Sequence, residues 1–482
     1  MPGSRIVNSF LWSFLEQGGV KLAQLIVQII LARILVPEMF GVLAILLVVV
    51  GVADMIAQSG LGTALVQEDD VNDTSFSTAL WLSMGLSALL YAIMYFAAPF
   101  IAEFYGMDDL VIYLRVMLLV VFINGANSVQ RSYLQKYMNF KLLSISSIVA
   151  TVGSGIVGIA CAIAGLGIWA LIIQVLAQSV FAFIVLLIVV PWKPSFSFNA
   201  KQAKSLYSYG WKMCVTSVLN TLYSNISELI IGKTCSTGDL GYYSQGRKWP
   251  IAAIGAGSNA LSNVLFPAFV ELKHDMPAFR NAAKRAVIDG TFVIAPLALG
   301  MAAVGEPLIA VLMTDKWLPC VPVFQFTCIS YSVLMLELVS FRAYMALGES
   351  GLYLKLHLIR IFLGFFVVGG AAILFRDIYV IAGVTSVYVV FTILIIDLQP
   401  AKRMYDFGRV KQLRCIMPVL GCSFVAATCA YGVTLFPLGY GIKLFLGLFV
   451  LVAVYILIAK MFRLQGYTDC KSILKSLADR KT

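Results

Sequence analysis

Long apolar runs are the feature that most constrains how this chain can fold. Fourteen segments of about 20 residues or more are dominated by hydrophobic side chains, and polar segments separate them. Their approximate bounds are 9–35, 41–66, 76–102, 110–131, 142–164, 167–190, 206–232, 242–269, 286–313, 319–345, 353–375, 378–397, 413–436 and 440–462. A helix needs about 20 apolar residues to cross a bilayer. The sequence therefore predicts an all-α polytopic membrane protein with fourteen transmembrane helices.

Composition separates this chain from soluble nucleic-acid-binding proteins, although its net charge of +11 would suit them. Hydrophobic residues make up 60% of the 482 positions, charged residues only 12%, and the mean hydropathy is +0.91. Soluble domains carry about a quarter charged residues. The basic residues lie in loops between apolar runs, which is typical of membrane topology. We therefore expect membrane lipids and no nucleic acid as partners.

The loop charges also predict an orientation. Of 35 Lys and Arg residues, 24, including Arg131, lie in or beside the loops on one side, and only Lys233, Lys316 and Arg376 on the other. Positive residues concentrate on the cytoplasmic side of a membrane, so both termini are expected in the cytoplasm. The loop 67–75 falls on the cytoplasmic side by this topology although it is acidic, and acidic residues carry little weight in this rule. The first apolar run is too long and too polar on one face for a cleavable signal.

Two of the predicted helices carry matching polar stripes. At about 100° per residue, the polar residues of each helix fall within one narrow arc. The first stripe consists of Gln17, Lys21, Gln24 and Gln28. The second consists of Ser217, Thr221, Ser224 and Glu228, with Asn220 beside it. Both stripes are expected to face a common aqueous space.

Further matches indicate an internal repeat. Phe40-Gly41 corresponds to Leu240-Gly241, and the motif Arg131-Ser-Tyr corresponds to Arg342-Ala-Tyr. Spans 1–6 and 7–12 are therefore predicted to be parallel six-helix repeats around a central cavity. The expected division is an N-lobe at 1–190, a cytoplasmic linker at 191–205, a C-lobe at 206–400, peripheral spans within 401–462 and a basic tail at 463–482.

Charged residues inside predicted spans are the main functional candidates. A charge near the bilayer centre costs roughly 2.5–3.5 kcal/mol on insertion scales, so it is expected to face a wet interior or a partner. Asp54, with Gln58 one turn away, and Glu337 are candidates for ion coupling, and each has helix packing as its alternative. The other charged candidates, whose alternatives are structural pairing or snorkelling to the membrane surface, are Lys21, Arg115, Glu228, Arg247, Lys248 and Arg360.

No catalytic, metal-binding or cofactor-binding pattern is visible. The nine cysteines are scattered, only two histidines occur, and neither HExxH nor GxSxG is present. Gly232-Lys233-Thr234 looks like the end of a P-loop, but Ser227 stands where the first glycine is required. We expect no cofactor and no enzymatic activity.

Short motifs resemble a known transporter family. They are AxxLxPExFG at 32–41, Asp54 followed by GLGTALVQ at 60–67, and the GLGIWAL that opens span 6. With 6+6+2 spans, the chain resembles bacterial polysaccharide transporters of the Wzx type, in the multidrug/oligosaccharidyl-lipid/polysaccharide exporter superfamily. The resemblance to colanic-acid and lipopolysaccharide translocases implies a flippase in the bacterial inner membrane. Its substrate would be an undecaprenyl-diphosphate-linked oligosaccharide, and polysaccharide polymerase or assembly proteins would be partners.

Other functions remain alternatives at this stage. A cation-coupled multidrug antiporter of the same superfamily would share twelve spans, but Lys21 and the other interior cations count against cationic drugs. A major facilitator permease is disfavoured by fourteen spans and by the acidic loop 67–75. A polysaccharide polymerase or ligase is disfavoured because every predicted outer loop is short.

Overall fold

The computed structural model describes residues 19–58, 60–68 and 71–469, and these residues form helices and connecting loops without β-strands. Within these ranges ten helices are long and apolar enough to cross a membrane, or eleven if one bent pair counts as a single span. Large apolar side chains such as Phe96, Ile188 and Leu374 are more than 70% exposed. Soluble proteins rarely expose so much apolar surface. The protein is a multi-pass membrane protein.

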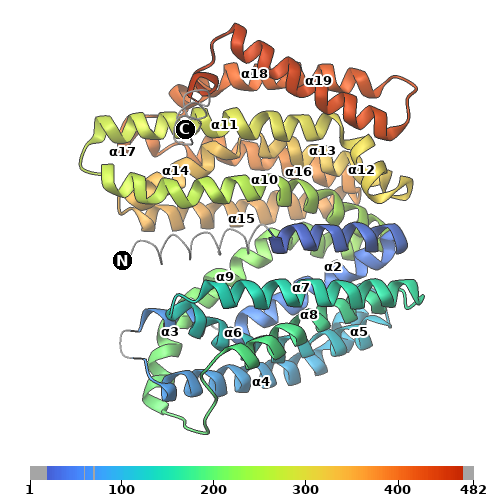
Figure 1. Cartoon of the computed structure of the whole chain (residues 1–482), viewed down its shortest axis with the longest axis vertical. Coiled ribbons are helices and arrows are strands. Elements are labelled where there is room, and N and C mark those ends of the chain that lie inside the picture. Colours follow the sequence, from blue (N-terminus) through green and yellow to red (C-terminus); the bar gives the residue numbers. More distant parts are fainter. Residues whose placement is uncertain (1–18, 59, 69–70, 470–482) are drawn as a thin grey trace, which may run out of the picture. The chain divides into compact units, whose positions relative to one another are not determined.

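The chain divides into two compact units, Met1–Gly241 and Tyr242–Thr482. Unit 1 begins, in its described part, with a helical segment at 19–34. Its other helices are α2 (Pro37–Gln58), α3 (Leu61–Gln67), α4 (Asp73–Tyr105), α5 (Leu110–Met117), α6 (Leu119–Lys136), α7 (Phe140–Ile163), α8 (Ile168–Val189) and α9 (Ala200–Thr234) (Figure 1).

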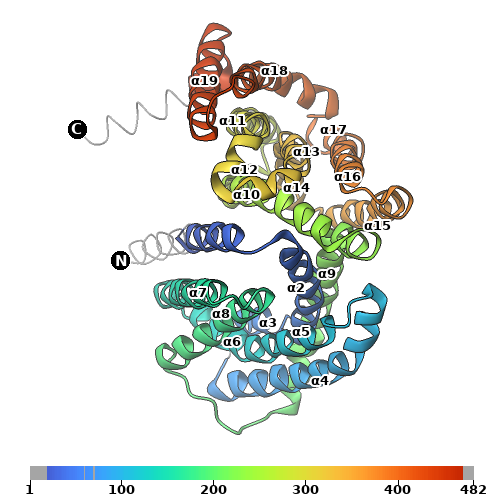
Figure 2. The same ribbon diagram turned by 90° about the vertical axis from the view of Figure 1, so that its right-hand side faces the viewer.

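Glycines let three helical segments of unit 1 pack closely. A Cβ atom added at Gly155 of α7 would lie 2.3 Å from Val27 of segment 19–34, and one at Gly158 would lie 2.8 Å from Gln174 of α8. Small residues allow such approach between membrane helices. These glycines therefore serve helix packing, and Figure 2 shows α7 and α8 side by side near segment 19–34.

The matched glycines Gly41 and Gly241 meet at a helix crossing within unit 1. A Cβ atom at Gly41 would lie 1.8 Å from the carbonyl oxygen of Thr237, and one at Gly241 would lie 2.0 Å from that of Pro37. The start of α2 and the start of α10 (Thr237–Leu272) therefore touch through their backbones. No side chain larger than hydrogen fits at either position.

The linker after α8 is fixed to the start of α4. Asn72 caps α4 by accepting a hydrogen bond from the Ser75 backbone N–H at 2.9 Å. The indole N–H of Trp81 donates to the carbonyl oxygen of Ser195 at 2.8 Å, and the Asn199 N–H donates to Thr78 Oγ1 at 3.1 Å. These bonds connect the linker to α4 just before α9 begins.

Unit 2 contains most of α10 and the following helices. They are α11 (Met276–Ala303), α12 (Gly305–Met313), η1 (Asp315–Cys320), α13 (Val321–Tyr331), α14 (Leu334–Ala346), α15 (Ser350–Phe375), α16 (Ile378–Thr392), η2 (Ile393–Asp397), α17 (Ala401–Tyr405), α18 (Arg409–Thr434) and α19 (Tyr440–Met461). Tyr455 of α19 donates to the Phe292 carbonyl of α11 at 2.7 Å. The last two long helices thus pack on α11 (Figure 2).

Helices occupy the predicted spans within the described residues, but several are interrupted. The predicted span 41–66 breaks before Gly60, whose φ of 65° is left-handed and suits glycine. The predicted span 319–345 bends by 44° between Tyr331 and Leu334. The predicted span 378–397 ends in a π-helical turn, Ile393–Asp397. A uniformly apolar composition does not reveal such breaks.

Candidate functional site

A polar pocket lies inside unit 1. Its volume is about 640 Å³, and its walls come from segment 19–34, α2, α5, α6, α7 and α8. The polar and charged lining residues are Lys21, Gln24, Asp54, Gln58, Asn124, Asn127, Ser128, Arg131, Ser147, Thr151, Gln178 and Ser179. So many polar groups among membrane helices mark the pocket as the candidate functional site.

Asp54 is the acidic residue of this pocket. Its Oδ2 accepts hydrogen bonds from Gln58 Nε2 at 2.9 Å and from Asn124 Nδ2 at 3.2 Å. Its Oδ1 is buried and has no hydrogen-bond partner among the described residues. One carboxylate oxygen is therefore held in place by two amides, and the other can accept a proton, a cation or a hydroxyl from a bound molecule.

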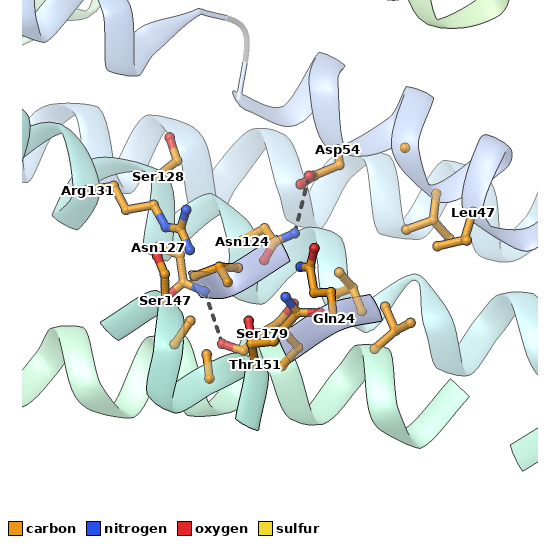
Figure 3. Close-up of a pocket in the computed structure, with 18 of the residues that line it drawn as sticks. Gln24, Leu47, Asp54, Asn124, Asn127, Ser128, Arg131, Ser147, Thr151 and Ser179 are labelled. Carbon is orange, nitrogen blue, oxygen red and sulfur yellow. Dashed lines mark hydrogen bonds between the residues drawn. The ribbon is translucent and has the colours of Figure 1, made fainter. Parts of the chain in front are cut away.

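Lys21 and Arg131 bring positive charge to the same pocket. Lys21 lies on segment 19–34, one turn before Gln24, and Arg131 lies on α6 beyond Asn124 and Asn127. Figure 3 shows Arg131 beside Ser128 and Asn127, and Asp54 bonded to Asn124 farther along. With Asp54 ionised, the pocket has one positive charge in excess, which favours an anionic ligand.

Amides and hydroxyls complete the lining. Asn127 Nδ2 donates to the Ser179 carbonyl at 3.1 Å, which fixes the amide orientation. Asn127 Oδ1 and Thr151 Oγ1 are buried without a partner in the described part of the chain. Buried polar atoms usually have a hydrogen-bond partner. These two atoms can form hydrogen bonds with a bound molecule or with water.

Of the first predicted stripe, Lys21 and Gln24 line the pocket. Gln28 lies two turns after Lys21 on the same helical segment and does not line it, and Gln17 lies outside the described residues. The second stripe lies on α9, beside α2. Thr221 Oγ1 contacts Met55 Sδ at 2.8 Å, next to Asp54 in the sequence. The rest of the second stripe also lies on α9 and outside the pocket lining, as does Asn220 beside it; these stripe residues are Ser217, Ser224 and Glu228.

Three further cationic candidates lie outside the pocket. The Arg115 guanidinium stacks over the Tyr95 ring at 4.0 Å and donates to the Tyr95 carbonyl at 3.4 Å. Arg247 lies over the Tyr243 ring at 5.5 Å, and Lys248 is exposed beside it on α10. Cation–π contact with Tyr95 accounts for Arg115 without a ligand.

Arg360 and Glu337 meet in unit 2. Arg360 Nη1 is bonded to Glu337 Oε1 and, at 3.1 Å, to Asp397 Oδ2. The Arg360 side chain is 8% exposed, that of Asp397 0% and that of Glu337 19%. With all three ionised, this cluster has one negative charge in excess. Asp397 ends the π-helical turn η2, and such turns often occur at functional positions.

Sequence reasoning missed several of these residues. Arg131 was counted among the loop cations, and the amides of α6 were not considered. Asn124, Asn127 and Arg131 recur every three or four residues in a predicted span, which is the pattern of one wet helix face and could have identified them. Asp397 lies at the end of an apolar run, and only the folded chain brings it to Arg360.

Comparison with known proteins identifies the family. Residues 30–322, more than half of the chain, match the family described as polysaccharide biosynthesis protein. The chain belongs to this family. The predicted resemblance to a bacterial polysaccharide biosynthesis family is thereby confirmed.

Relatives of this chain include three proteins that are named for the biosynthesis of a cell-surface polysaccharide. It is 26% identical over 323 residues to the succinoglycan biosynthesis transport protein ExoT of Rhizobium meliloti, covering 67% of this chain and 65% of that protein. It is 27% identical over 279 residues to the teichuronic acid biosynthesis protein TuaB of Bacillus subtilis, covering 58% of each. It is 22% identical over 318 residues to the lipopolysaccharide biosynthesis protein WzxC of Escherichia coli, covering 64% of this chain and 63% of that protein. The chain thus matches less than two thirds of the length of each.

Solved structures show the fold. The lipid II flippase MurJ in an inward closed conformation superposes with a TM-score of 0.76 at 13% identity, over 94% of this chain and 98% of MurJ. An inward-facing multidrug transporter of the MATE family superposes with a TM-score of 0.63 at 14% identity, over 81% of this chain and 98% of that one. The chain therefore has the fold that these two solved transporter structures share.

Proposed function

We propose that this protein is a flippase that moves undecaprenyl-diphosphate-linked oligosaccharides from the inner to the outer leaflet of the plasma membrane. The product would supply lipopolysaccharide or exopolysaccharide synthesis. The observation that carries the proposal is the pocket of unit 1, where Lys21, Arg131 and a set of amides lie among membrane helices. Membership in the polysaccharide biosynthesis family supports the same substrate class.

The pocket chemistry suits the head of such a lipid. Diphosphate oxygens accept charge-assisted hydrogen bonds from Lys21 and Arg131, and sugar hydroxyls bond with Asn127, Thr151 and Gln24. The polyprenyl tail remains in hydrocarbon, so only the polar head needs shielding over about 30 Å. A membrane potential that is negative inside favours outward movement of an anion, by roughly 2.3 kcal/mol per charge per 100 mV.

Ion coupling is the second part of the proposal. Asp54 offers an unpartnered oxygen in the unit 1 pocket that Lys21 also lines, and Glu337 belongs to a cluster with excess negative charge in unit 2. Protonation or cation binding at either carboxylate would change the local charge by one. Such a change can bias a two-state transporter between its inward-open and outward-open states.

The proposed architecture follows the predicted topology. Fourteen spans form two parallel six-helix repeats and a peripheral pair, and both termini lie in the cytoplasm of a bacterial cell. The two repeats alternate access to a cavity that includes the unit 1 pocket. Other residues proposed to contact the substrate, besides those that line the pocket, are the α9 stripe with Arg115, Arg247, Lys248 and Arg360. Polymerase and assembly proteins would receive the exported unit.

Charge replacement at Lys21 tests the proposal. In a strain that lacks its own copy of this gene, the wild-type chain is expected to restore surface polysaccharide. Lys21→Ala and Lys21→Glu are expected to abolish it at normal membrane levels, because the diphosphate loses a cation. Lys201→Glu, an exposed site on α9, is the matched control. Full polysaccharide output from Lys21→Glu would remove this residue from the mechanism. Drug resistance conferred by the wild-type chain without polysaccharide output would favour an antiporter instead.

A further inference from the structure

A second hollow, unrelated to the transport pocket, lies between α11, α18 and α19 of unit 2. Its volume is about 780 Å³. Its walls are mostly apolar, with Ile288 from α11, Val419 and Val425 from α18, and Ile458 and Met461 from α19. Gly421 leaves space in the same wall, because a Cβ atom added there would meet nothing within 4 Å. We call this hollow the α18–α19 groove.

Basic residues gather at one end of the α18–α19 groove. Lys284 and Arg463 line the groove itself. An adjoining hollow of about 370 Å³ shares Lys284 and Cys415 with it and adds Arg280, Lys411 and Arg414. No ion pair or hydrogen bond of the Lys284, Arg414 or Arg463 side chain is found within residues 19–58, 60–68 and 71–469. These side chains are therefore available to bind an anion.

Asp406 is the one acidic residue lining either hollow among the described residues. Lys411 Nζ donates to its two carboxylate oxygens at 2.9 and 3.0 Å, and Arg280 Nη1 donates at 3.0 Å. The hydrogen bond and charge of Lys411, with Arg280 beside it, lower the pKa of Asp406 below its ordinary value of 3.8. An ionised Asp406 cancels one of five positive charges, which leaves a net charge of +4 around the end of the groove.

The α18–α19 groove is apolar along its length and has unpaired cations at one end, which suits an anionic amphiphile. An anionic amphiphile places its acyl chain along the apolar wall and its phosphate among Lys284, Arg414 and Arg463. These three residues lie in or beside segments that the charge bias predicts to be cytoplasmic, where the leaflet is negatively charged. A free phosphate ion would leave the apolar wall unused. The basic segment 470–482 has four Lys or Arg residues and one Asp, so its charge has the same sign as the groove.

We propose that the α18–α19 groove binds an anionic phospholipid of the surrounding bilayer. One acyl chain lies against Val419, Val425 and Ile458, and the phosphate is held by Lys284, Arg414 and Arg463. This site is separate from the transport pocket and does not depend on the proposed flippase activity.

Lipid retention by the full-length protein tests the headgroup. Purified protein is delipidated in detergent, titrated with phosphatidylglycerol or phosphatidylcholine, and analysed by native mass spectrometry. Phosphatidylglycerol is expected to bind more tightly. Lys284→Ala and Arg463→Ala are each expected to weaken it about fivefold, since each removes one cation near an anionic headgroup. The double variant Lys201→Ala/Lys273→Ala removes two positive charges at exposed positions outside the groove and should still bind as the wild type does. Equal binding of the two lipids to the wild type would overturn the proposal.

A filled groove tests the acyl-chain part. Gly421→Leu projects a side chain into the open space of the groove and is expected to weaken phosphatidylglycerol binding about tenfold or more, as several methylene contacts are lost. Gly432→Leu is the matched control on α18, because its Cβ position is also open and it does not line the groove. Unchanged binding by Gly421→Leu would contradict the assignment if its thermal stability equals that of Gly432→Leu.

Two other occupants would appear as distinct outcomes. The Lys475→Cys variant is treated with a short bismaleimide that can bridge this cysteine to Cys415. Efficient cross-linking that added phosphatidylglycerol does not diminish would show that segment 470–482 occupies the groove. A dimer that Gly421→Leu dissociates would show a second copy there. Either result would overturn the proposal.

Discussion

The crossing of α2 and α10 in unit 1 gives the most quantitative prediction for this protein. Replacing Gly41 by Ala would place a Cβ atom 1.8 Å from the Thr237 carbonyl oxygen, whereas ordinary contact begins at 3.4 Å. The obstacle is backbone, so no side-chain rotation relieves it. The two helices must move apart, and contacts on both sides of the crossing are lost.

The expected cost of Gly41→Ala is about 2 kcal/mol. A clash with backbone belongs at the upper end of the roughly 1–3 kcal/mol that overpacking typically costs, and the better helix propensity of Ala returns at most about 1 kcal/mol. For a unit of this size, a loss of about 2 kcal/mol lowers the Tm by about 4–8 °C. Thermal unfolding of the purified protein, followed by intrinsic fluorescence, measures this shift.

Two variants sharpen the Gly41 experiment. Gly85→Ala is the control on α4, where an added Cβ atom meets nothing within 4 Å, and its Tm is expected to equal or exceed the wild-type value. Gly241→Ala is expected to resemble Gly41→Ala because its Cβ atom would lie 2.0 Å from the Pro37 oxygen. The double variant should cost less than the sum, since separating the helices relieves both clashes. A Gly41→Ala protein as stable as Gly85→Ala would refute the close crossing.

Two further predictions concern buried charge. In Asp54→Asn, the amide oxygen can replace Oδ2 as acceptor for Gln58 and Asn124 while the NH₂ group takes the place of unpartnered Oδ1. The free energy of unfolding is therefore expected to change by less than about 1 kcal/mol, whereas the transport rate falls about tenfold or more. A wild-type transport rate in this variant would exclude ionised Asp54 from the transport cycle. Arg360→Ala leaves Asp397 and Glu337 without their cation and is expected to lower the free energy of unfolding by about 3–5 kcal/mol. The control Arg115→Ala is expected to lower it by about 1 kcal/mol. Equal Tm values for these two variants would show that the Arg360 cluster is not an ion pair.

Local patterns in the sequence predicted the helices and part of the pocket. Hydrophobic runs located the long apolar helices of the described residues because the bilayer imposes a minimum length on every crossing segment. Lys21, Gln24 and Asp54 were predicted from polarity within those runs, and all three line one pocket. A single charged residue in an apolar helix is informative because few environments can accommodate it.

Pairing between distant helices could not be predicted in the same way. Glu337 and Arg360 were each identified, yet their contact depends on how α14 and α15 pack, and Asp397 joins them only through the π-helical turn of α16. Arg131 was assigned to a loop because a charge-counting rule cannot separate the last turn of a span from the loop after it. The break before Gly60 needs a left-handed residue, which hydropathy does not register.

Flipping by purified protein tests the central claim most directly. The protein is reconstituted into liposomes with a fluorescent undecaprenyl-diphosphate oligosaccharide, and membrane-impermeant quenching of the sugar label reports its leaflet over time. We predict protein-dependent exchange between leaflets for the wild type, a reduction of about tenfold or more for Lys21→Glu, and normal exchange for Lys201→Glu. Wild-type liposomes that exchange the labelled lipid no faster than protein-free liposomes, with or without an imposed potential or ion gradient, would contradict the account.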